Sequence, residues 1–204
     1  MQVHSPDTQY KATLTREQFL FYEMRTTARL LSEGKSDEDA VVEIVTGNLF
    51  QYPTERMLRN IARVCVKRLR AMESDTLVRM IGSSSVETAK QVCLYAMMCD
   101  SRLVWDFMIT VIGEKYRLLD MSFHRMDVDV FMTQLQEQHD YVAQWSDSTI
   151  KKIKQVLIRT LVENEYLDSS KAERLNPVLL DPGLEAEIRN AGNLSVLPAF
   201  NRFD

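Results

Sequence analysis

The chain has 204 residues, of which 45% are hydrophobic and 26% charged, and its formal net charge is -4. These values are typical of an ordinary globular protein. The acidic balance excludes general adhesion to polyanions but is compatible with a local basic site. The first eleven residues contain no apolar stretch of the secretory-signal kind, and the most apolar segment, LVWDFMITVIG, is about half as long as a membrane-spanning helix. We therefore expect a cytoplasmic protein with no membrane partner.

Nearly every segment predicts helix, because only six glycines and five prolines occur and no alternating run of β-branched residues is present. A capping-box pattern predicts that the first helix begins at Thr15 and ends before Gly34. Ser36 is expected to cap a second helix that ends at Thr46, and a third helix is expected from about residue 54 to 72. The last two helices are joined by a turn, which predicts a helix-turn-helix-like domain over residues 1–73.

Residues 74–204 predict a larger helical domain. A short helix is expected to end near Gly82, and longer helices are expected at about residues 86–98, 101–119, 127–145 and 148–166. Three of the five prolines follow, which predicts a loop, a short helix over residues 182–190 and an extended tail. The expected fold class is all-α. A winged-helix-like element is expected where the helix at 148–166 leads into LVENEYLD.

The third predicted helix carries an unusual charge pattern, because six basic residues stand against one acid between Glu55 and Arg70. At about 100° per residue, five of these cations fall within an arc of about 80°, and apolar residues occupy an arc nearly opposite. We call these five the basic row: Arg56, Arg59, Arg63, Lys67 and Arg70.

Neighbouring like charges on a helix cost a few tenths of a kcal/mol per pair, so the basic row needs compensation. Three interpretations stay open at this point: a phosphate backbone, an acidic surface of a partner protein, or a face that is solvated or paired within the chain. The row lies on the second helix of a predicted helix-turn-helix and is rich in arginine. Both features favour contact with duplex DNA.

A second basic helix is predicted within WSDSTIKKIKQVLIRTLVENEYLD. Its apolar residues form one stripe, while Lys151, Lys152 and Arg159 lie on another side. Lysine point charges suit phosphates better than base edges. These three residues are predicted to form a second DNA-contacting surface, although an ordinary core helix would show a similar pattern.

Residues with catalytic or metal-binding chemistry are few. His124 and His139 have no partner at metal-ligand spacing, and Asp127 with Asp129 fits the start of a helix better than a metal site. The three cysteines also lack zinc-type spacing. No phosphate-binding loop, dinucleotide fingerprint or hydrolase motif is present. The sequence therefore predicts no enzyme activity, no cofactor or metal, and no small-molecule substrate.

Several phrases together resemble one protein family. NLFQYPTERMLRNIARVCVKRL, LYAMMCDSRLVWDFMITVIGEKYRLLD, WSDSTIKKIKQVL and LNPVLL are similar to the BrxA proteins of bacterial BREX phage-defence systems. The resemblance implies a small cytoplasmic, all-helical accessory protein that acts beside a DNA methyltransferase, an ATPase and other BREX components. It also implies DNA binding and no known catalytic activity, and it supplies no catalytic motif to transfer.

The sequence thus predicts a non-catalytic accessory protein of a BREX system that binds duplex DNA through a basic helix face. Two alternatives remain. The chain could be a scaffold whose basic faces dock acidic surfaces of other BREX subunits, or a helical bundle that binds RNA.

Overall fold

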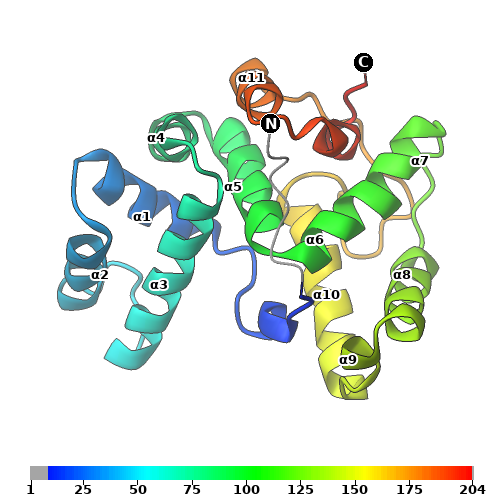
Figure 1. The fold of residues 1–204 in the computed structure, drawn as a ribbon, viewed down its shortest axis with the longest axis horizontal. Coiled ribbons are helices and arrows are strands. Elements are labelled where there is room, and N and C mark those ends of the chain that lie inside the picture. The colour runs from blue at the N-terminus through cyan, green and yellow to red at the C-terminus, as the bar shows by residue number, and fades with distance from the viewer. Residues whose placement is uncertain (1–8, 204) are drawn as a thin grey trace. The chain divides into compact units, whose positions relative to one another are not determined.

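The computed structural model describes residues 9–203 and confirms the all-α class. Helices follow one another along these residues, no strand is formed among them, and the only bridge between described residues joins Ser122 to Arg174. The chain divides into two compact units (Figure 1). One unit is Phe19–Asp100, and the other combines residues 9–18 with residues 101–203.

The unit Phe19–Asp100 contains five α-helices. In it, α1 packs against α3 and α4, α2 packs against α3, and α5 packs against α3 and α4. Helix α3 therefore contacts three other helices of the unit and keeps one side for solvent. The bounds are α1 Phe21–Ser32, α2 Asp37–Thr46, α3 Glu55–Ala71, α4 Asp75–Ser83 and α5 Val86–Asp100.

Side-chain caps determine where α2 and α3 begin. The Ser36 hydroxyl accepts a hydrogen bond from the amide of Asp39, and the Thr54 hydroxyl accepts one from the amide of Met57. Both starts agree with the sequence. The predicted start of the first helix at Thr15 is wrong, because Thr15 ends a short 3₁₀-helix and α1 begins only after Leu20, which has a left-handed backbone (φ 58°).

The unit extends beyond residue 73, where the sequence placed a domain boundary. Helices α4 and α5 pack against α1 and α3, so their apolar faces complete the core of this unit. Arg68, only 2% exposed, also ties the unit together. Its guanidinium donates to the carbonyl of Phe19 at 3.5 Å and lies 3.8 Å from the carboxylate of Asp100. One buried cation thus contacts the first and last residues of the unit.

The other unit is built from short and long helical segments. The 3₁₀-helix η1 packs against α10, which itself contacts α8, and the C-terminal 3₁₀-helix η3 packs against η2, α7 and α11. The bounds are η1 Ala12–Thr15, α6 Arg102–Phe107, η2 Met108–Gly113, α7 Glu114–Arg117, α8 Arg125–Gln138, α9 Asp140–Ala143, α10 Asp147–Glu163, α11 Pro182–Asn190 and η3 Leu194–Phe200.

The helix predicted over residues 101–119 forms as one run that contains a π-helical segment, η2. Gly113, the last residue of η2, lies against the C-terminal segment. A Cβ added at Gly113 would be 3.2 Å from the amide nitrogen of Ala199 and 3.2 Å from Cβ of Pro198. The buried Tyr166 hydroxyl donates to the carbonyl of Ala199. The predicted extended tail is therefore a packed helical turn from Leu194 to Phe200.

Two finer expectations about the fold are not confirmed. Residues 47–54 connect α2 to α3, which is longer than the turn of about 3–4 residues in a helix-turn-helix. After α10, residues 164–181 form turns, bends and a single bridge residue, Arg174, rather than the two strands of a wing.

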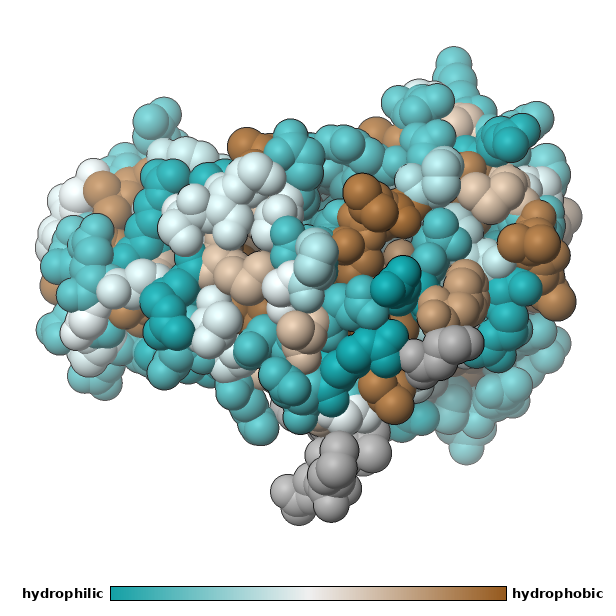
Figure 2. Space-filling model, turned by 90° about the horizontal axis from the view of Figure 1, so that it is seen from above, coloured by the Kyte–Doolittle hydropathy of each residue, from teal (hydrophilic) through white to brown (hydrophobic). Residues whose placement is uncertain are grey.

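The surface carries no large apolar band on the face shown in Figure 2, where hydrophilic side chains predominate and apolar ones form small patches. Across residues 9–203, no helix combines the length and the apolar character that crossing a membrane requires.

Candidate nucleic-acid interface

The orientation of the basic row follows from the packing of the opposite side of α3. Leu58, Ala62, Cys65 and Leu69 are buried there, as the sequence predicted. Because these side chains fix the rotation of the helix, the basic row must face outward. Four of its members are exposed and Arg59 is half-exposed.

The segment before α3 is held in place by polar contacts. The Asn48 side chain accepts a hydrogen bond from the amide of Tyr52 at 3.0 Å, and the Tyr52 hydroxyl donates to Glu23 of α1 at 2.6 Å. Burial, together with this hydrogen bond to Glu23, raises the pKa of Tyr52 above its ordinary value. These contacts fix the start of α3, where Arg56 and Arg59 lie, against the rest of the unit.

Three members of the basic row form ion pairs within the unit. Arg59 pairs with Glu55 one turn earlier, and the Lys67 ammonium lies 2.6 Å from Asp100. Arg70 donates to Asp37 of α2 at 2.7 and 3.0 Å. These pairs neutralise part of the row, mainly in its C-terminal half.

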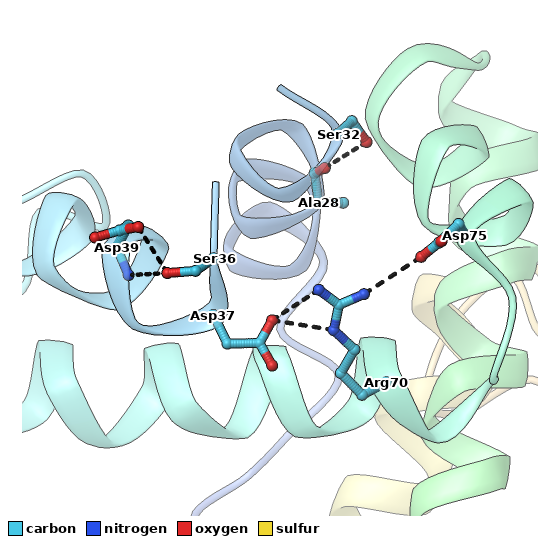
Figure 3. A network of polar contacts seen from close by, with 7 residues as sticks. All are labelled: Ala28, Ser32, Ser36, Asp37, Asp39, Arg70 and Asp75. Atoms are coloured by element: carbon cyan, nitrogen blue, oxygen red, sulfur yellow. Dashed lines mark hydrogen bonds and ion pairs between the residues drawn. The ribbon is translucent and has the colours of Figure 1, made fainter. Parts of the chain in front are cut away.

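Arg70 is the most constrained member of the row (Figure 3). Besides its two hydrogen bonds to Asp37, its guanidinium reaches Asp75 at the start of α4 at 3.3 Å. The hydrogen bond to Asp37 raises the pKa of Arg70. Arg70 therefore connects α2, α3 and α4, a role that suits a structural residue.

Arg56 and Arg63 differ from the other three. Both are exposed, and neither forms an ion pair with any residue between 9 and 203. Seven residues separate them, so they lie on the same side of α3 about 10 Å apart along its axis. The uncompensated positive charge of the row is thus concentrated in its N-terminal half.

A groove of about 500 Å³ runs between α2 and α3 beside the row. Val41, Val42 and Val66 form its apolar part. Acidic side chains of α2 stand on one side, including Asp37, and cations of the row stand on the other, including Arg63.

The second predicted set lies on α10, in the other unit. Lys151 and Lys152 are exposed and form no ion pair with a described residue. Arg159 donates to Glu163 at 2.6 Å and to Gln18 at 3.3 Å. The cations that the sequence predicted on the outer sides of the two helices are therefore exposed, apart from the half-exposed Arg59.

In the described part of the chain, no three side chains of His, Cys, Asp or Glu gather closely enough to hold a metal ion. Cys65, Cys93 and Cys99 are buried and unpaired by disulfides. Burial raises the pKa of the Cys65 thiol to about 12. These cysteines behave as small core residues.

Comparison with known proteins agrees with this all-helical architecture and names a family. The BrxA family model matches residues 8–192. The chain belongs to the BrxA family of BREX phage-defence systems. A BREX protein BrxA of Bacillus cereus (strain H3081.97) is 34% identical over 185 residues, which cover 90% of this chain and 92% of that protein.

The chain is also similar to a second curated relative and to a solved structure. BREX protein BrxA of Paramagnetospirillum magneticum (strain AMB-1) is 26% identical over 90% of this chain and 92% of its own. A crystal structure of an uncharacterized protein from Magnetospirillum magneticum superimposes with a TM-score of 0.79 at 26% identity, covering 94% of this chain and 97% of that one. The fold described above is therefore shared with an experimentally determined structure.

In this BrxA-family chain, the sequence pattern located the cations but not their acidic partners. Asp37 and Asp75 are first residues of helices and read as helix-start acids. Asp100 closes the unit, far along the chain from Lys67. No local signal assigns such long-range pairs. The position of Asp37 in the first turn of the neighbouring helix α2 was the only local indication of an acidic partner for the basic row.

Proposed function

We propose that this protein binds duplex DNA through the outward face of α3, as a non-catalytic component of a BREX defence system. The observation that carries the proposal is the pair Arg56 and Arg63, which are exposed, lie on one side of the helix and form no ion pair with a described residue. Guanidinium groups bind phosphate oxygens in a bidentate manner, which suits such a pair.

The remaining cations of the basic row contribute unequally to this proposal. Among residues 9–203, Arg59 forms an ion pair only with Glu55 on its own helix, whose side chain is 68% exposed. It can therefore exchange that partner for a phosphate at little cost. Lys67 and Arg70 are held by Asp100, Asp37 and Asp75. The proposed contact surface is therefore centred on Arg56, Arg59 and Arg63, and Lys67 and Arg70 lie at its margin.

The family supports the setting of this function. The relatives carry the name BREX protein BrxA, and membership of their family supports a role in a BREX system. The proposed DNA contact itself rests on the charge and exposure of α3 and not on those names.

A second candidate function is docking of an acidic protein surface. The groove between α2 and α3 favours it, because Val42 in its apolar part is 53% exposed and already shares the groove with arginines. Carboxylates within the unit also form ion pairs with three members of the row, which is in keeping with an acidic partner. RNA in place of DNA is the third outcome that the test must separate.

The test is the salt dependence of binding to labelled duplex DNA, measured by fluorescence anisotropy. Each phosphate contact contributes about 0.9 to the slope of log affinity against log salt. The double variant Arg56→Gln, Arg63→Gln should reduce that slope by nearly two units over about 50 to 200 mM salt. The matched control is Arg117→Gln, Arg174→Gln, which has the same net charge but changes exposed arginines of the other unit.

Equal slopes in the double variant and the control would eliminate α3 as the DNA contact. Tighter binding of an RNA duplex of the same sequence would favour the RNA alternative. DNA affinity that is unchanged while other BREX subunits no longer co-purify with the double variant would favour the docking function.

A further inference from the structure

A cavity lies between α8 and α10, in the unit that does not contain the basic row. It has a volume of about 1080 Å³. The two helices run in opposite directions and are joined through α9 (Figure 1). An ion pair between Lys154 of α10 and Asp129 of α8, 2.8 Å long, joins the two walls. The groove is therefore formed already in the free chain.

The floor of the groove is apolar. Val128 of α8 and Ile150 of α10 line it and are buried, whereas Ile158 and Val162 line it and remain partly exposed. Ile150, Ile158 and Val162 lie at multiples of four residues and so form one row along α10. The core-facing residues of α10 form a different row, which includes Ile153 and Leu157. Ile158 and Val162 are thus left for a molecule that enters the groove.

The rim of the groove has spare positive charge at both ends. Arg125 begins α8, and Lys151 lies in the second turn of α10. Because the helices are antiparallel, these cations stand at opposite ends. Neither forms an ion pair with a described residue. Two of the three lining acids are engaged, because Asp129 pairs with Lys154 and Asp168 accepts from the Asn176 amide. The third, Asp147, lies one turn before Lys151 on α10 and offsets part of the positive charge at that end. The charge available to an incoming molecule is mainly positive.

We propose that this groove binds an acidic amphipathic helix of a partner protein. The apolar stripe of that helix would cover Ile158 and Val162, and carboxylates near its two ends would meet Arg125 and Lys151. Helices commonly bind in this way, with apolar anchors at i, i+3 or i+4 and i+7 in a hydrophobic groove. These two cations favour a partner helix with acidic ends and repel a basic helix.

A nucleic acid suits the groove less well than a helix does. The phosphate surface of a duplex offers no hydrocarbon to cover Ile158 and Val162. Base edges are contacted by a protein element that enters a groove of the duplex, whereas here the groove belongs to the protein. The predicted DNA role of Lys151 and Arg159 therefore competes with this proposal, and the experiment separates the two. The proposal does not depend on DNA binding by α3, because the residues belong to a different unit.

The test uses two synthetic labelled helical peptides with leucine at i, i+4, i+7 and i+11. The first carries glutamate at the flanking positions and the second carries lysine at each of them. Anisotropy with the full chain should show that the acidic peptide binds and that the basic one binds at least about tenfold more weakly. Ile158→Asp should weaken the acidic peptide about tenfold or more, since it removes a buried apolar contact and adds a repelling charge.

Arg125→Gln with Lys151→Gln should weaken binding of the acidic peptide severalfold. Arg56→Gln with Arg63→Gln is the control, which should leave peptide affinity unchanged. Ile158→Val, which keeps an apolar surface, serves as the folding control and should retain binding with an unchanged melting temperature.

Three results would overturn the proposal: no binding of the acidic peptide, equal binding of both peptides, or peptide binding that the groove variants leave unaltered. A loss of DNA affinity in Arg125→Gln with Lys151→Gln, without peptide binding, would assign this face to nucleic acid instead.

Discussion

Replacing Asp37 by asparagine should strengthen DNA binding while it weakens the fold. Asp37 lies opposite the basic row and accepts two hydrogen bonds from Arg70, at 2.7 and 3.0 Å (Figure 3). Asparagine keeps the size of the side chain but removes the charge, so Arg70 loses its main counter-ion and keeps only the longer contact to Asp75 at 3.3 Å.

The structure bounds the size of both effects. The Asp37 and Arg70 side chains are 46% and 44% exposed, so solvent screens their attraction and the pair contributes about 0.2–1 kcal/mol to stability. Loss of an acid from the first turn of α2 costs about 0.3–1 kcal/mol more. On the DNA side, a released Arg70 can add at most one phosphate contact, which steepens the salt slope by up to about 0.9.

Asp39→Asn is the matched control. Asp39 lies in the same first turn of α2 and has the same charge, but it contacts Ser36 rather than α3. Both variants should lower the free energy of unfolding, measured by urea denaturation. Only Asp37→Asn should steepen the salt dependence of duplex DNA binding. Identical DNA behaviour of the two variants, or weaker binding in Asp37→Asn, would refute the reasoning that Asp37 competes with phosphate for the row.

Three further predictions concern the fold. Gly113→Ala should destabilise the protein by about 0–2 kcal/mol in thermal melts, because overpacking against the backbone of Ala199 and the ring of Pro198 outweighs the gain of about 1 kcal/mol from helix propensity. Gly82→Ala is the control: its new Cβ would lie 3.3 Å from Cγ of Arg29 and in ordinary contact with the Arg29 backbone, so it should be neutral or stabilising in the same melts. Hydrogen bonds from Ser122 lower the pKa of Asp120 from 3.8 to about 2. Because the folded-state pKa is depressed, the stability that this group adds is present above about pH 4 and is lost as pH falls towards 2, so acid unfolding curves of wild type and Asp120→Asn should converge there; curves that stay parallel would contradict this. Burial raises the pKa of Cys65 and Cys99 to about 12, so the native thiols should react with a thiol reagent only after unfolding, and rapid labelling of the folded chain would show that they are accessible.

Most helix starts could be predicted from residues close to them in the sequence. Ser36, Thr54 and Pro182 mark helix starts through a capping hydroxyl or a fixed φ, and each of the helices concerned begins where the sequence predicted. The predicted helix start at Thr15 was wrong because the Thr15 hydroxyl does not cap a helix. It donates instead to the carbonyl of Ala12 and closes a 3₁₀ turn. Local hydrogen bonding of this kind competes with capping, and only packing decides between them.

Features that depend on distant parts of the chain were not predictable. The 3.6-residue period identified the exposed side of α3, and hence the basic row, but said nothing of Asp100, which pairs with Lys67. The same period placed Arg68 off the row without revealing that its guanidinium is buried against Phe19. The groove between α8 and α10 depends on how two helices pack, and a single helix pattern does not contain that information.

Photo-crosslinking shows whether the outer face of α3 contacts DNA. A photoreactive residue in place of Asn60, which is exposed on α3 between Arg56 and Arg63, should crosslink to labelled duplex DNA. The crosslink should decrease as salt rises and when unlabelled duplex is added in excess, and a photoreactive residue in place of exposed Gln144 should give none. Absence of a crosslink from position 60, under conditions where the protein binds the duplex, would contradict the account.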